Sequence, residues 1–168
     1  MQRYNRKVVS CESCQFLFVF FFAGRRWRPN KSVEVYFSPS NACEENIVKM
    51  INGSRQEVDV AVYSLNNTDI VEALKEADRR GVKVRILTDR LQAAGRSSKV
   101  RDLYRAGVNI RVHSKHKIEH NKFAVFDGET AVTGSYNWTP AKTVRTVFFS
   151  MTGRRWQHFP NVLSGCGR

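Results

Sequence analysis

The sequence predicts an α/β fold, an α-β-α sandwich around a mixed sheet. Short runs rich in β-branched residues alternate with stretches whose apolar residues recur at helical spacing. Such alternation is typical of strands joined by crossover helices. Towards the end of the chain, two predicted strands are joined by Asp127-Gly128, a dipeptide typical of a tight hairpin. This hairpin adds antiparallel strands to the predicted sheet. At 168 residues the chain has the length of one domain.

The first predicted elements are a strand, a helix and a buried strand. Residues 33–37 alternate between polar and apolar side chains, as a half-buried strand does. Asn41 and Glu44 have the spacing of a capping box, which would open a helix that Asn52-Gly53 ends. Residues 58–63 are largely β-branched and predict a buried strand. The apolar side of the helix would carry Ile47, Val48 and Ile51.

Two further helix–strand units follow. Asn67 or Thr68 caps a helix that ends at Gly81, and residues 82–87 form the next strand. Ser97 or Ser98 caps another helix, which ends at Gly107 before a strand at 108–112. The inward faces of the two helices are predicted from their apolar stripes, which are Ile70, Val71, Leu74 and Ala77 in the first and Val100, Leu103 and Tyr104 in the second.

The most specific pattern in the chain is His-x-Lys, four residues, Asp, six residues, Gly-Ser-x-Asn. Its members are His120, Lys122, Asp127, Gly134, Ser135 and Asn137. Side chains two apart on a strand point the same way, so the strand 122–127 would carry the histidine and the lysine on one face at one end. The hairpin at Asp127 would fold Ser135 and Asn137 back beside the histidine.

These groups suit a tetrahedral phosphate. A neutral imidazole is a nucleophile near pH 7, and an ammonium and an amide can hold phosphoryl oxygens as charge builds on them. The alternative is a buried strand that happens to contain a His and a Lys. Six residue identities at fixed spacings favour the functional interpretation over that one.

At these residues the chain resembles the phospholipase D superfamily, in particular its single-motif members, which include bacterial endonucleases and mitochondrial cardiolipin-hydrolase-like proteins. The resemblance covers residues 33–141 and implies that His120 attacks phosphorus to form a phosphohistidine. It further implies that Lys122 and Asn137 bind the phosphoryl oxygens with Ser135 close by, and that Asp127 gives structural or electrostatic support. No metal or cofactor is implied. Because the chain has one motif, the resemblance implies a homodimer in which the second copy of His120 protonates the leaving oxygen.

Loops that follow the predicted strands are candidate walls of the site. Tyr63 and Ser64 follow the second strand, where the family places a similar pair, and residues 89–96 follow the third. His116 and Lys117 lie in a basic loop before the motif, which either grips substrate phosphates or is a solvated face. With Gly134 of the motif, these residues are the candidate substrate-binding set.

The net charge of +13 suggests nucleic acid, but its distribution weakens that argument. Residues 1–31 hold seven basic residues and one acid, and residues 142–168 hold five basic residues and no acid, which leaves +2 for the middle. The nuclease interpretation, on DNA or RNA, therefore follows from the resemblance. The alternatives are a phospholipid headgroup hydrolase and an inactive remnant that binds nucleic acid.

The ends of the chain differ from the predicted catalytic domain, 32–141. Residues 1–31 form a basic leader with an apolar run at 16–23, too short to span a bilayer as a helix. If this run acts as a signal or anchor, the protein is exported or membrane-attached; otherwise it is cytoplasmic. Cys11 and Cys14 form a lone CxxC without a second pair, so free thiols are expected.

The tail, 142–168, shows no helical stripe and no clean strand, and no acidic residue follows Glu129. The resembled family continues with a Glu-Asn stretch, whose Glu orients the catalytic histidine, and then with a buried strand and an amphipathic helix. A reading frame shifted by one base after Ala141 permits such an ending. We therefore expect the last strand and helix to be missing or altered, with lower stability and activity than in relatives, a hypothesis that the nucleotide sequence around codon 141 tests.

Overall fold

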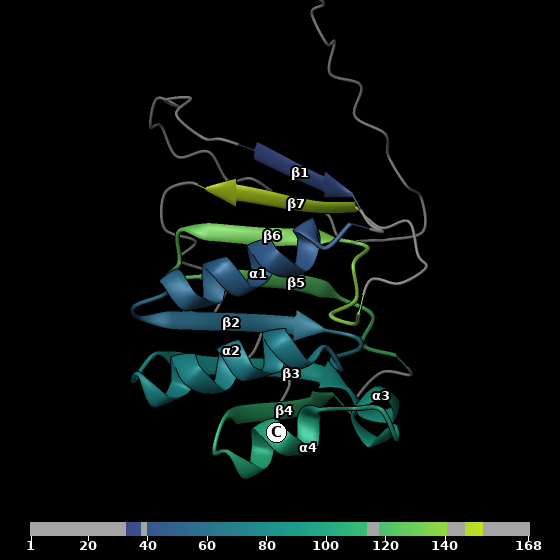
Figure 1. The fold of residues 1–168 in the computed structure, drawn as a ribbon. Coiled ribbons are helices and arrows are strands. Elements are labelled where there is room, and N and C mark those ends of the chain that lie inside the picture. Colours follow the sequence, from purple (N-terminus) through teal and green to yellow (C-terminus); the bar gives the residue numbers. More distant parts are fainter. Residues whose placement is uncertain (1–32, 38–39, 114–117, 141–146, 153–168) are drawn as a thin grey trace, which may run out of the picture.

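The computed structural model describes residues 33–37, 40–113, 118–140 and 147–152, the last as backbone only. One sheet of seven strands runs through these residues in the order β1-β7-β6-β5-β2-β3-β4 (Figure 1). The strands are β1 (Val33–Phe37), β2 (Glu57–Val62), β3 (Lys83–Asp89), β4 (Asn109–His113), β5 (Lys122–Phe126), β6 (Thr130–Gly134) and β7 (Val147–Thr152). The helices are α1 (Ala42–Gly53), α2 (Thr68–Arg79), α3 (Arg90–Ala94) and α4 (Val100–Arg105).

The sheet is mixed, which confirms the predicted fold class. Strands β2, β3 and β4 are parallel, while β5 runs antiparallel to β2 and is followed by antiparallel β6, β7 and β1. The carboxyl ends of β2, β3, β4 and β6 therefore lie at the same edge of the sheet as the amino end of β5. This edge brings together loops from five different parts of the chain.

The main core lies between the sheet and helices α1, α2 and α4, which cover one of its faces (Figure 1). The predicted stripe of α2 is confirmed, because Ile70, Val71, Leu74 and Ala77 are all buried. On the opposite face, Ala61 and Leu87 form a smaller buried cluster with the partly buried Phe123.

The structure corrects two predicted details of the helices and decides between two alternatives for a third. Asn41 has a helical backbone conformation, and its side chain makes no capping hydrogen bond, so the predicted capping box does not form. Asn67, not Thr68, caps α2 by accepting from the N–H of Ile70 at 3.0 Å. Tyr104 on α4 is 72% exposed and does not face the core.

A last strand is present at 147–152, so, of the two outcomes expected for it, missing or altered, the structure excludes a missing strand. Strand β7 pairs with β6 through Thr130↔Thr152 to Gly134↔Phe148 and with β1 through Val33↔Met151 to Phe37↔Val147. Backbone groups make these pairs, so a strand can form there without the alternating side-chain pattern that sequence reasoning looks for. The predicted leader, and the segment in which the final helix is expected to be missing or altered, lie outside the described residues. Within the described residues, no helix is long and apolar enough to cross a membrane.

Candidate active site

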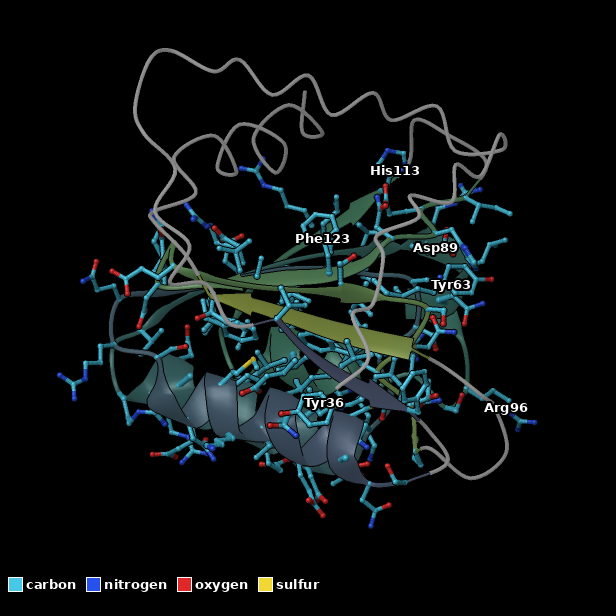
Figure 2. The ribbon with its side chains drawn as sticks, turned by 90° about the horizontal axis from the view of Figure 1, so that it is seen from above. Tyr36, Tyr63, Asp89, Arg96, His113 and Phe123 are labelled. Atoms are coloured by element: carbon cyan, nitrogen blue, oxygen red, sulfur yellow. The ribbon has the colours of Figure 1, made fainter. Side chains whose placement is uncertain are left out.

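Five of the six motif residues, all except Asp127, lie at the edge of the sheet where the five loops meet. Tyr63 follows β2, Asp89 ends β3 and His113 ends β4, and Figure 2 shows these three on the same side of the molecule. The segment that carries His120 leads into β5 and is tied to β2 by a hydrogen bond from the Tyr63 N–H to the Asn121 carbonyl, 2.8 Å. The topology thus places His120 beside the end of β2.

His120 and Lys122 are both arranged around the ring of Tyr63. The imidazole meets the phenol edge-on, with ring centroids 4.6 Å apart. The Lys122 Nζ lies 5.0 Å from the centroid of the same ring and donates a hydrogen bond to the His120 carbonyl, 2.7 Å. His120 is exposed, whereas Lys122 and Tyr63 are half-buried. An imidazole open to solvent and an ammonium held close to it can together receive a phosphate.

The pKa values of both groups are lowered. Partial burial lowers the pKa of His120, the charge of Lys122 lowers it further, and the Asp89 carboxylate partly opposes this shift. Burial also lowers the pKa of Lys122, and Glu119 partly opposes that shift. A lowered pKa favours the neutral imidazole at neutral pH, which is the form that can act as a nucleophile.

The segment after β6 carries the serine and the asparagine of the motif. Tyr136 and Trp138 are buried, while Ser135 is exposed and Asn137 is half-buried, so the side chains alternate between core and site. The backbone of Trp138 fixes this segment to the loop after β2. Its backbone N–H donates to the Ser64 carbonyl at 3.1 Å, and its backbone carbonyl accepts from the N–H groups of Asn66 and Asn67 at 3.0 Å each. Asn137 is thereby held next to the Tyr63–Ser64 loop.

The position of Gly134 follows from the hairpin register. Phe123 pairs with Thr133, which places Gly134 beside Lys122 at the site edge. Among the described residues, the Oδ1 atom of Asn137 is buried without a hydrogen-bond partner. The candidate substrate residues His116 and Lys117 lie outside the described part of the chain. The structure thus brings together His120, Lys122, Tyr63, Ser64, Gly134 and the Ser135–Asn137 segment.

Asp127 is not brought to this site. It follows the far end of β5, five residues or about 17 Å along the strand from Lys122. Its carboxylate accepts hydrogen bonds from the backbone N–H groups of residues 55–57, at 2.8 to 3.1 Å, and its own N–H donates to the Glu57 carbonyl at 2.8 Å. The grouping of Asp127 with the catalytic residues is therefore wrong, and the structural support that was its other predicted role matches these contacts.

We expect Asp127→Ala to destabilise the fold. The substitution leaves three backbone N–H groups without their carboxylate acceptor and removes a residue that adopts a φ of 52° in the hairpin turn. Loss of such a cluster should lower the free energy of unfolding by about 2–4 kcal/mol, measured by denaturant unfolding. Glu129→Ala, an exposed change in the same turn, is the control and should stay within about 0.5 kcal/mol. Equal losses in both variants would contradict this role of Asp127.

Three residues outside the predicted set of site residues also shape the site, and two of them lie in the segment 89–96, which the sequence analysis gave as a candidate wall without assigning a role to either. Gln92 on α3 donates from Nε2 to the Tyr63 hydroxyl at 3.1 Å. Asp89 is buried and accepts hydrogen bonds from α3 and from the loop before His120. The alternation of the Ser135–Trp138 segment could have identified Trp138 as a buried anchor, because every second residue there is aromatic. Among the described residues, no group of three His, Cys, Asp or Glu side chains is placed to hold a metal ion.

A mixed α/β sheet with a histidine and a lysine of one His-x-Lys motif at its edge defines a phospholipase D-like domain. A family model described as "Cardiolipin synthase, PLD-like domain" matches residues 47–147. The chain belongs to the phospholipase D superfamily.

Named relatives agree with this assignment. The chain is 33% identical over 113 residues to a phospholipase D of Rickettsia bellii (strain RML369-C), covering 67% of this chain and 56% of that protein. It is 33% identical over 89 residues to a mitochondrial cardiolipin hydrolase of Chlamydomonas reinhardtii, covering 53% and 40%. The chain thus spans about half the length of these relatives. The crystal structure of Nuc, a phospholipase D family member from Salmonella typhimurium, superposes with a TM-score of 0.69 at 28% identity, covering 80% of this chain and 91% of Nuc.

Proposed function

We propose that this protein is a metal-independent phosphodiesterase that acts through a phosphohistidine, and that its substrate is DNA or RNA, cut internally. One observation carries this proposal: the exposed His120 and the Lys122 ammonium share the ring of Tyr63 at the open edge of the sheet. This arrangement supplies a nucleophile and a positive charge at one place. The preference for nucleic acid comes from the resemblance of the single motif to the bacterial endonucleases.

The reaction has two steps. The neutral imidazole of His120 forms a bond to phosphorus while the bond from phosphorus to the leaving oxygen breaks, and Lys122 and Asn137 hold the non-bridging oxygens. The leaving oxygen takes a proton from the His120 of a second copy of the chain, in a homodimer with the site at the interface. Water then attacks the phosphohistidine, its proton passes to that second imidazole, and free His120 returns.

A phospholipid headgroup is the second candidate substrate. The names of the relatives support it, since one is a phospholipase D and another a mitochondrial cardiolipin hydrolase. The chemistry at phosphorus would be the same, because a phospholipid headgroup and a nucleic-acid backbone both present a phosphodiester.

The deciding experiment is turnover with excess EDTA on a panel of plasmid DNA, single-stranded RNA and vesicles of cardiolipin or phosphatidylcholine. Cleavage of nucleic acid supports the nuclease, and release of headgroup supports the lipid hydrolase. Binding of nucleic acid without turnover, equal in wild type and His120→Ala, would overturn the enzymatic proposal in favour of an inactive remnant.

The pH dependence of turnover should reflect the lowered pKa of His120. The attacking imidazole must be neutral and the imidazole of the second copy must be protonated, so kcat/KM should be bell-shaped in pH, with a maximum below the ordinary histidine pKa of about 6.5. Burial and the charge of Lys122 lower the pKa of His120 and Asp89 raises it, so Lys122→Met should move the maximum to higher pH. A pH profile of kcat/KM for both proteins tests this expectation, and a downward or absent shift in the variant would contradict it.

A further inference from the structure

Asp89 connects two walls of the candidate site through one buried carboxylate. It is the last residue of β3 and is 4% exposed. Its Oδ1 accepts from the N–H groups of Leu91 and Gln92 at 2.9 and 3.0 Å, which caps α3. Its Oδ2 accepts from the N–H of Glu119 at 3.1 Å. The two oxygens thus hold different segments.

Each of these two segments is connected to a residue of the site, the loop to His120 and helix α3 to Tyr63. Glu119 directly precedes His120, so the Oδ2 contact fixes the backbone from which the imidazole projects. On the other side, Gln92 in the first turn of α3 holds the Tyr63 hydroxyl at 3.1 Å, and the Tyr63 ring meets the imidazole edge-on. Asp89 therefore constrains the position of His120 in two ways. It binds the backbone just before His120, and it caps α3, whose Gln92 holds the Tyr63 ring that the imidazole contacts.

We propose that Asp89 is a positioning residue, which sets His120 against Tyr63 by holding both the loop before His120 and the first turn of α3. The proposal rests on the proposed function for its catalytic consequence but not for its structural test. A 1 Å misplacement of a reacting group can reduce a rate by about 100-fold. We therefore expect these contacts of Asp89, which we call the Asp89 clamp, to affect kcat.

The charge of Asp89 supports the same role. Burial alone would raise the pKa of its carboxyl, but the three backbone donors and the nearby His113 hold that pKa below its usual range. Asp89 therefore stays ionised and raises the pKa of His120, against the effects of burial and of Lys122. The other acidic group at this edge, Glu119, acts on Lys122 and lies 4.0 Å from His113.

Three variants test the clamp. Asp89→Asn has one amide oxygen and one NH₂ group, so it cannot accept from both segments. Gln92→Leu removes the hold on Tyr63 without changing any charge. Asp127→Asn is the matched control, because that carboxylate also accepts from three backbone N–H groups but at the opposite end of β5.

The readout is NMR of the His120 ring, assigned by comparison with His120→Ala, and it needs no substrate. We expect the Tyr63–His120 ring cross-peak to be lost in Asp89→Asn and in Gln92→Leu and kept in Asp127→Asn. The pKa of His120 should fall in Asp89→Asn alone. A cross-peak that persists in either site variant, or that is lost in the control as well, overturns the proposal; if Asp89→Asn does not fold, Gln92→Leu decides.

Turnover separates this proposal from the proposed function. If wild type cleaves its substrate and Asp89→Asn loses about 10- to 100-fold in kcat with a smaller change in KM, the clamp acts on catalysis. If wild type is active and Asp89→Asn keeps its kcat, positioning is overturned while the phosphodiesterase stands. If wild type shows no turnover, the proposed function fails, and the cross-peaks still decide whether Asp89 positions His120.

Discussion

His120→Ala should abolish EDTA-resistant turnover, with a fall of roughly 10⁴-fold or more in kcat, because it removes the only group proposed to bond to phosphorus. Lys122→Ala should cost less, about 10²- to 10³-fold, because it removes one source of charge stabilisation and leaves the nucleophile in place. Lys83→Ala is the matched control: this exposed lysine starts β3, at the end of the strand away from the site, and its loss should leave kcat unchanged.

The covalent intermediate gives a second readout for the same variants. A phosphohistidine is labile in acid and stable in alkali, so quenching wild-type protein in alkali during turnover of a phosphorus-labelled substrate should leave label on the chain. His120→Ala should carry none. Turnover that persists in His120→Ala, or label that remains on it, would contradict the role of this histidine.

The parts of the fold that sequence predicted are those set by local signals. The stripe of α2 and the β-branched run of β2 depend on periodicity within one element, and both were located correctly. His120 and Lys122 were correctly placed together because two residues on one short segment need no knowledge of the rest of the chain. The predicted hairpin forms, with positive φ at Asp127 and Gly128, 52° and 67°, but the pairing of Phe126 with Thr130 leaves three residues, 127–129, in its loop.

Sequence reasoning failed where one side chain binds backbone far away in the chain. The N–H groups that Asp127 binds are 70 to 72 residues distant, and Asp89 reaches Glu119 across 30 residues. Backbone N–H groups have no sequence signature, so neither contact could be predicted from residue types. Strand β7 was not predicted for the same reason, because its pairing with β6 and β1 is made by backbone groups. Helix α3 has five residues, too few to show a helical period.

Trp138→Ala should be the most destabilising single substitution among the site-forming residues. The side chain is 1% exposed and packs in the main core, while its backbone joins the motif segment to the loop after β2. Truncating a buried tryptophan to alanine costs about 3–5 kcal/mol, a large share of the roughly 5–15 kcal/mol that holds a domain folded. We expect a matching loss in the free energy of unfolding by denaturant titration.

Tyr104→Ala is the control for this truncation, because Tyr104 is also aromatic but is 72% exposed on α4, and its loss should change stability by no more than about 0.5 kcal/mol. Trp138→Phe keeps an aromatic core residue and should fold, but the smaller ring lets the Ser135–Trp138 segment shift. Because Asn137 is proposed to hold a phosphoryl oxygen, Trp138→Phe should then lose kcat by more than its loss of stability explains, measured well below its unfolding temperature. A folded Trp138→Phe with wild-type kcat would show that this anchor supports the fold alone and that the position of Asn137 does not depend on it.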